Sequence, residues 1–183
     1  MKIIDNNKKL RKAGIGDWLK LQGNRDRLVK KPVERLSRKH GDVIYGRHAV
    51  NKLLGPGYHR DTYDYDVYSK NPRSHAVMVE NRIDRGTKSN LAYVEPARID
   101  MYGKTKTVYR VKVRPYDTGE VDFNRMPSDV RYVKKNGVRY ETIGKAHKKY
   151  SKMIDTGQTH RMPKAFWDKA DIDNHRFFKK RRI

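Results

Sequence analysis

Two neighbouring stretches of this chain decide its fold: YGRHAVNKLL over residues 45–54 and TYDYDVYS over residues 62–69. The first carries a glycine followed by apolar residues at helical spacing, which predicts a turn that leads into a short helix. The second is rich in β-forming residues and alternates in character, which predicts a strand. Because side chains two apart on a strand share a face, Asp64 and Asp66 are expected to point the same way.

Two carboxylates on one face suit hard divalent cations such as Mg²⁺ or Mn²⁺, which prefer oxygen ligands. A third acid on a neighbouring strand would complete a two-metal site with ions about 3.5–4 Å apart. Asp122, in the stretch VDFNRMP over residues 121–127, is the candidate, and Glu120 competes with it for that role. Gly46, at the start of the predicted helix, would let backbone N–H groups approach phosphates.

A bare Asp-x-Asp pair is common on surface strands and turns, so a solvated acidic loop is the alternative interpretation of this stretch. The order of glycine, short helix, acidic strand and later acidic strand favours the metal site. In such a site one ion activates an attacking hydroxyl, and the other neutralises a leaving pyrophosphate.

The remaining sequence predicts an α+β fold with a short mixed sheet covered by helices. Strands are expected over residues 91–99, 106–114 and 120–123 and in a hairpin at Asn136-Gly137, and helices within 5–39 and over 47–54, 72–85, 141–154 and 162–179. The predicted organisation is a basic helical N-terminal extension at 1–40, a core at 41–160, and a C-terminal helix with a basic tail at 161–183.

Composition narrows the class of protein further. The 183 residues include 44 Lys and Arg against 21 Asp and Glu, a net charge of +23, and no Cys. The absence of Cys excludes disulfide scaffolds, Cys-ligated zinc and thiol catalysis. No apolar run approaches the roughly 18 residues that a membrane span needs. The strong positive charge favours a nucleic-acid partner and gives no support for a membrane.

The glycine–helix stretch, the Asp-x-Asp strand and the VDFNRMP stretch together resemble the nucleotidyltransferase superfamily with the DNA polymerase β-like fold. The wording is most similar to that of virus- and phage-encoded members, and the resemblance covers roughly residues 40–180. It implies transfer of a nucleoside monophosphate from an NTP to a hydroxyl, with two Mg²⁺ or Mn²⁺ ions as cofactors.

The resemblance also implies roles for particular residues. Asp64 and Asp66 match the metal-binding acids, and Asp122 matches the third catalytic and metal-binding acid, which helps to deprotonate or position the acceptor hydroxyl. Gly46 matches the first glycine of the phosphate-cradling turn. Arg47 stands where the family has Gly or Ser, so its large cation would either meet the phosphates or block the pocket.

Two further residues are phosphate-binding candidates. Ser69 follows the acidic strand, and capping of the next helix is the alternative role for its hydroxyl. Lys164, with Asp168 and Arg176, resembles the Lys/Asp/Arg-containing last helix of related nucleotidyltransferases, where the lysine would reach the triphosphate. The alternative for these three is an amphipathic surface helix.

The expected partners are a nucleotide and a nucleic acid, either RNA or DNA, and the expected location is the host cytoplasm or a virion. A rival hypothesis is a catalytically inactive nucleotidyltransferase-fold protein that binds nucleic acid or serves as a structural part of a virion or ribonucleoprotein. Arg47 and the basic composition favour the rival, whereas retention of all three acids favours the enzyme.

Overall fold

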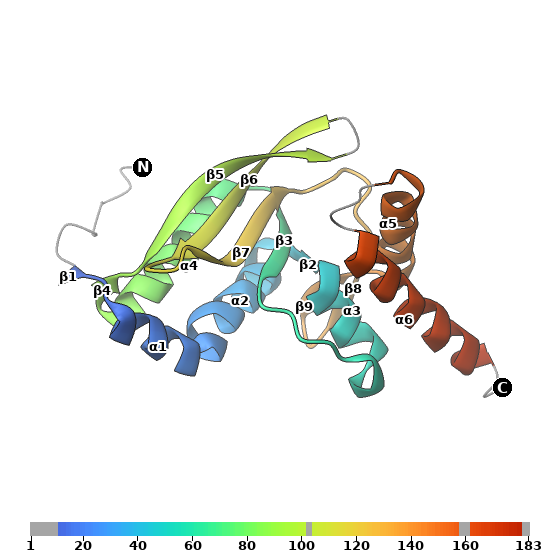
Figure 1. Ribbon diagram of the computed structural model, residues 1–183, viewed down its shortest axis with the longest axis horizontal. Coiled ribbons are helices and arrows are strands. Elements are labelled where there is room, and N and C mark those ends of the chain that lie inside the picture. Colours follow the sequence, from blue (N-terminus) through green and yellow to red (C-terminus); the bar gives the residue numbers. More distant parts are fainter. Residues whose placement is uncertain (1–10, 102–103, 158–161, 181–183) are drawn as a thin grey trace.

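The computed structural model describes residues 11–101, 104–157 and 162–180. In this part of the chain one mixed sheet of seven strands has the order β5-β6-β7-β3-β2-β9-β8 (Figure 1). Its strands are β2 (Val43–Tyr45), β3 (Tyr65–Ser69), β5 (Ala92–Met101), β6 (Lys104–Val113), β7 (Thr118–Arg125), β8 (Tyr132–Lys135) and β9 (Val138–Glu141). The short strands β1 (Arg11–Lys12) and β4 (Ser89–Asn90) pair separately and in parallel.

Helices pack against this sheet and lie at both ends of the molecule. They are α1 (Ile15–Gly23), α2 (Lys31–His40), α3 (Gly46–Leu54), α4 (Pro72–Thr87), α5 (Ile143–Asp155) and α6 (Met162–Lys180), with a π-helical turn η2 (Asp26–Lys30) before α2 and a 3-10 turn η3 (Pro56–Tyr58) after α3. The α+β class is therefore confirmed. The sheet is wider than the short one expected, because the ten-residue strands β5 and β6 extend one edge and the β8–β9 hairpin the other.

A large apolar core lies between one face of the sheet and the layer formed by η2, α2 and α4. Tyr65, Val67, Val121 and Phe123 enter it from the central strands β3 and β7. Because strand side chains alternate, the acids between them, Asp66 among them, face the other side of the sheet. Tyr65 therefore lies on the face of the sheet opposite Asp66.

A second apolar cluster joins α3 to α5 and α6, which lie at the end of the molecule far from α1 (Figure 1). Its buried members include Val50, Tyr150 and Ile172. This cluster holds the C-terminal helices beside the start of α3, and so it brings residues more than 100 positions apart in the sequence close to Gly46.

The predicted hairpin turn at Asn136-Gly137 is confirmed, since both residues have positive φ, 53° and 75°, as a two-residue turn of this kind requires. The proposed division at residues 40 and 160 stays a prediction, although Leu28 and Val33 from before residue 40 pack into the same core as the sheet. Arg181 and Arg182 of the predicted basic tail lie outside the described residues. No helix in the described part of the chain is both long and apolar enough to cross a lipid bilayer.

Candidate active site

A row of side chains crosses four strands on the sheet face opposite the large core. Strand β3 pairs with β7 in parallel, and this register sets Asp66 directly beside Asp122. On the outer sides of this pair, Tyr45 of β2 is the partner of Asp66, and Arg110 of β6 is the partner of Asp122. Asp64 precedes β3 by one residue and therefore lies near the start of the same strand.

This row forms one wall of a cavity of about 320 Å³. The acids Asp64, Asp66 and Asp122, which the sequence predicted to act together, all line it. The remaining lining residues come from β2, α3, β6, β7, α5 and α6, and they are Tyr45, Gly46, Arg47, Arg110, Asn124, Lys149, Tyr150, Met153, Lys164 and Ala165.

Gly46 is required where β2 turns into α3. Its φ is +68°, a conformation that side chains disfavour, and a Cβ placed there would lie 2.3 Å from Oδ2 of Asp66. The start of α3 therefore passes directly against this carboxylate. The structure places Gly46 at the helix start that the sequence predicted, beside an acid that the sequence expected to bind metal.

Asp66 is a buried carboxyl group with a raised pKa. Burial raises its pKa from 3.8 to about 7, and the negative charges of Asp64 and Asp122 act in the same direction. Lys149 and Lys164 oppose the shift. Asp66 is thus buried close to two other carboxyl groups. A bound cation would offset their mutual repulsion.

The three carboxylates line one cavity, but they are not arranged as ligands of one ion. Within the described residues, no group of three His, Cys, Asp or Glu side chains is arranged to hold a metal ion. Asp122 instead accepts a 3.3 Å hydrogen bond from Nε of Arg110. The oxygen donors and the crowded charge of Asp66 fit Mg²⁺ or Mn²⁺ chemically, so Asp64, Asp66 and Asp122 are the residues that would hold such ions.

Two lysines complete the charge balance of the cavity from the helical side. Lys149 of α5 donates to Glu141 at 3.1 Å, and its Nζ lies 4.3 Å from the centre of the Tyr45 ring. Lys164 of α6 lines the cavity as well, as expected for a group that meets phosphate. The cavity therefore has an acidic strand wall and a basic helical wall.

Arg47 lines the cavity, but its charge is already committed. The side chain is 1% exposed, and its Nη1 donates to Asp168 at 2.9 Å and to Asp171 at 2.8 Å, both on α6. Nη2 donates to the carbonyl oxygen of Tyr58. The guanidinium thus fastens α3 to α6, and Asp168 serves as its structural partner.

Ser69 lies outside the cavity. Its buried hydroxyl is 2.8 Å from Nδ1 of His75 and accepts a hydrogen bond from the backbone N–H of Asn71 at 3.1 Å. The same Nδ1 atom is 2.7 Å from Oδ2 of Asp42. These contacts give Ser69 a structural role just before α4, although the N-cap of that helix is Asn71 and no side chain caps it.

Glu120 does not share the cavity with Asp122. Its buried carboxylate accepts a 2.8 Å hydrogen bond from Nε of Arg25, and this arginine also stacks over the Tyr63 ring at 4.1 Å. The N-terminal helical region therefore buttresses the strand ends that carry the acids. Of the two competing acids, Asp122 is the one that faces Asp64 and Asp66.

Sequence reasoning missed three polar residues of this site. Arg110 and Lys149 belong to no recognisable motif, since each lies among several other basic residues. Asn124 donates to the hydroxyl oxygen of Tyr45 at 2.6 Å, and its spacing of two residues from Asp122 on a strand is a signal that would have placed it on the same face.

The fold of the described residues resembles the nucleotidyltransferase fold of a solved viral structure. The crystal structure of the Megavirus polyadenylate synthase matches it with a TM-score of 0.60 over 93% of this chain, at 17% sequence identity. The chain spans 40% of the length of that viral enzyme. The expected resemblance to a virus-encoded nucleotidyltransferase fold is confirmed.

A second solved structure, JHP933 from Helicobacter pylori, overlaps 68% of this chain and 55% of its own at 14% identity, with a TM-score of 0.36. No protein-family model matches the sequence, and no curated protein does.

Proposed function

We propose that this chain is a metal-dependent nucleotidyltransferase that moves a nucleoside monophosphate from an NTP to a hydroxyl of a nucleic acid. The observation that carries the proposal is the convergence of Asp64, Asp66 and Asp122 on one cavity, opposite Lys149 and Lys164. The fold match to a viral polyadenylate synthase supports an RNA acceptor. The net charge of +23 supports a polyanionic acceptor of either kind.

In this reaction the acceptor oxygen bonds to the α-phosphorus of the NTP, and the bond from that phosphorus to pyrophosphate breaks. Divalent ions held by the acids supply charge neutralisation of the phosphates. Asp122, next to Asp66 across the strand pair, is the residue proposed to receive or orient the acceptor proton. In this role Asp122 would exchange its hydrogen bond from Arg110 for one to the acceptor hydroxyl.

The residues proposed for the nucleotide phosphates are the two lysines and the backbone at the start of α3. Lys149, Lys164 and Gly46 all line the cavity, and the N-terminus of α3 carries backbone N–H groups of the kind that bind phosphate oxygens. Arg47 is not assigned to phosphate, because its guanidinium is bound by the acids of α6.

A second candidate function is nucleic-acid binding without catalysis, alone or in a virion or ribonucleoprotein. Two observations favour it: Asp122 is paired with Arg110, and Arg47 fills with a buried side chain the position that nucleotidyltransferases give to a small residue. The first function requires nucleotide transfer and the second excludes it, whereas both require nucleic-acid binding. A transfer assay therefore separates them.

The test incubates the purified chain with each α-³²P-labelled NTP, Mg²⁺ or Mn²⁺, and single-stranded RNA. The enzyme proposal expects label on the RNA with wild type and background label with Asp64→Asn/Asp66→Asn. Asp61→Asn is the matched control, because it removes an exposed acid from the same loop without touching the cavity. Absence of transfer with every NTP, despite folded protein that binds RNA, would establish the second function.

A further inference from the structure

A second charged concavity lies on the side of the molecule away from the acids. The groove runs between η2–α2 and α4, which cover the sheet face opposite Asp66, and has a volume of about 500 Å³. Its lining includes six arginine and lysine side chains and no carboxylate; the six are Arg27, Lys31, Arg35, Lys39, Arg82 and Arg85. All six are exposed.

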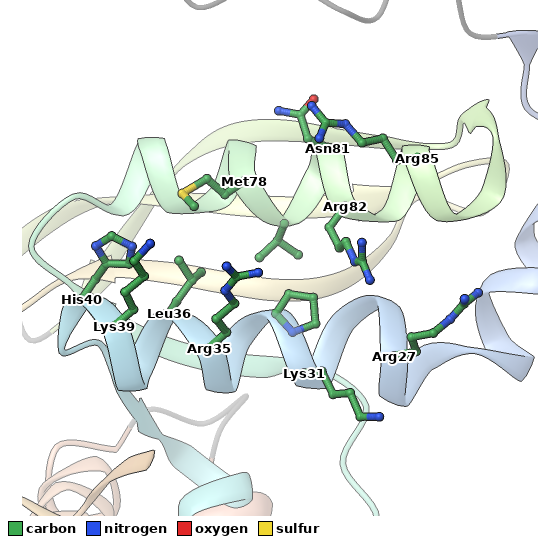
Figure 2. Close-up of a pocket in the computed structure, with 12 residues that line it drawn as sticks. Arg27, Lys31, Arg35, Leu36, Lys39, His40, Met78, Asn81, Arg82 and Arg85 are labelled. Carbon is green, nitrogen blue, oxygen red and sulfur yellow. The ribbon is translucent and has the colours of Figure 1, made fainter. Parts of the chain in front are cut away.

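The basic side chains occupy both walls of this groove. Figure 2 shows Arg35 and Lys39 reaching from α2 toward α4, and Arg82 reaching from α4 toward α2. The floor between them is apolar and includes Leu36 and Val79. A chain of phosphates lying in the groove would therefore be contacted by cations from two sides.

The spacing of these cations is unfavourable for the helix itself. Arg27, Lys31, Arg35 and Lys39 follow one another at intervals of four, and like charges at that spacing repel along a helix. Neighbouring cations are neutralised, since Lys30 pairs with Asp26 at 2.7 Å and Arg38 with Glu34 at 2.8 Å.

The groove cations have no such partners, because in the described part of the chain none of the six forms a salt bridge. An anionic partner would explain why this row of exposed cations, which repel one another, forms no salt bridges within the described residues.

Basic surface also continues from the groove toward the catalytic cavity. A hollow at the start of α4 shares Met78 and Asn81 with the groove and Asn124 with the cavity. Its lining carries four more cations and no carboxylate; they are Lys70, Arg73, Lys106 and Arg125. The groove and the cavity thus lie at two ends of one basic path around the edge of the sheet.

We infer that the α2–α4 groove binds the sugar-phosphate backbone of a nucleic-acid strand. Exposed cations on two walls match a flexible polyanion that carries one charge per nucleotide. The path to the cavity makes the bound strand a suitable acceptor, but binding in the groove requires no catalysis. The inference therefore stands or falls separately from the proposed transferase activity.

The test measures fluorescence anisotropy of a 5′-fluorescein-labelled 20-nucleotide single-stranded RNA between 50 and 300 mM NaCl, with a DNA strand of the same sequence in parallel. The groove variant is Arg35→Gln/Lys39→Gln/Arg82→Gln. The matched control is Arg131→Gln/Lys134→Gln/Lys148→Gln, which also removes three cations, all exposed and outside the linings of the groove, the hollow and the cavity.

The groove variant is expected to bind RNA at least about ten-fold more weakly, and the slope of log affinity against log salt is expected to fall by about 2, since each single-strand phosphate contact contributes about 0.7. The control should stay within about three-fold of wild type. Equal losses in both variants would overturn the inference, because net charge alone would then explain binding. Binding of the groove variant at wild-type strength would overturn it as well.

A mapping experiment on the wild-type chain covers the case in which a variant does not fold. RNA carrying 4-thiouridine is photocrosslinked, and crosslinked peptides from η2–α2 or α4 are the expected result. Crosslinks confined to other elements, or groove-dependent binding of phosphatidylserine vesicles without any effect on RNA, would contradict the inference. Binding is measured without NTP, so a chain that binds RNA through the groove but transfers no nucleotide would contradict the proposed transferase and leave this inference standing.

Discussion

At the scale of single residues, the cavity depends on two neighbouring positions at the start of α3, Gly46 and Arg47, which have different roles. Gly46 permits a backbone path that no other residue fits, because the space for a side chain is occupied by Asp66. Arg47 lines the same cavity and holds α6 through Asp168 and Asp171. Gly46 thus allows α3 to begin directly beside Asp66, and Arg47 holds α6 against α3.

Gly46→Ala is expected to destabilise the protein and displace the Asp66 carboxylate. A left-handed conformation costs a non-glycine residue about 1–2 kcal/mol, and the close approach to Asp66 adds to this cost. Urea denaturation measures the loss. Gly16→Ala is the control, because a Cβ at Gly16 meets nothing within 4 Å, and helical Ala is favoured over Gly by roughly 0.5–1 kcal/mol. Equal stability of the two variants would contradict the role given to Gly46.

Arg47→Met is expected to cost about 3–5 kcal/mol of unfolding free energy, since it leaves the buried Asp168 without its charge partner. Arg60→Met is the comparison, because Arg60 bonds to the same Asp171 but is 38% exposed, where such pairs contribute about 0–1 kcal/mol. Urea titrations compare the two. Similar small losses would show that the guanidinium of Arg47 does not fasten α3 to α6.

At the scale of elements, the parallel pairing of β3 with β7 decides which acids meet, because its register sets Asp66 beside Asp122. Helix α4 crosses behind these strands, and its last turn connects to β5 through a buried carboxyl group. Oδ1 of Asp84 accepts hydrogen bonds from the backbone N–H groups of Leu91 and Ala92 at 3.0 and 2.7 Å. Burial raises the pKa of Asp84 to about 6 despite these bonds.

The raised pKa of Asp84 gives stability a defined dependence on pH. Because the folded state holds this proton more tightly, the contribution is fully present below about pH 3.8 and is lost as pH rises through about 6. Asp84→Asn keeps the acceptor for both backbone bonds and cannot ionise. It is therefore expected to be about 2–3 kcal/mol more stable than wild type at pH 8 and nearly equal at pH 4.

Urea midpoints at the two pH values test this prediction. A stability difference of Asp84→Asn from wild type that stays constant between pH 4 and pH 8 would disprove it. Asp61→Asn, on an exposed aspartate, should leave stability nearly unchanged at both.

At the scale of the whole molecule, Asp64, Asp66 and Asp122 share one cavity, while cations line the α2–α4 groove and the hollow at the start of α4. The α2–α4 groove, the hollow at the start of α4 and the cavity lie along one path. The chain has a net charge of +23. Such a charge opposes compaction through self-repulsion. The same charge would attract a nucleic acid, the class of ligand proposed for the groove.

Salt is therefore expected to stabilise the chain in the absence of nucleic acid. Raising NaCl from 0.1 to 1 M shortens the screening length from about 10 to about 3 Å, which weakens the repulsion. The urea midpoint should rise, and it should rise less for Arg35→Gln/Lys39→Gln/Arg82→Gln, which has three fewer positive charges. A midpoint that falls with salt would show that ion pairs outweigh repulsion in this protein.

The sequence alone determined the local elements and the acidic strand pair. Alternation in TYDYDVYS and the Asn136-Gly137 turn act over a few residues, so neighbouring side chains suffice to predict them. The sequence left Asp122 and Glu120 as competing third acids, the resemblance favoured Asp122, and the strand register sets Asp122 beside Asp66.

Only the tertiary structure decided which distant groups share the cavity and which are committed elsewhere. Strand register and helix packing bring Arg110 and Lys149 to the cavity. The guanidinium of Arg47 is bound by Asp168 and Asp171, which lie about 120 residues further along the chain. The basic groove likewise exists because α2 and α4 pack side by side. Such long-range pairings depend on how whole elements pack, and no local pattern of residues encodes them.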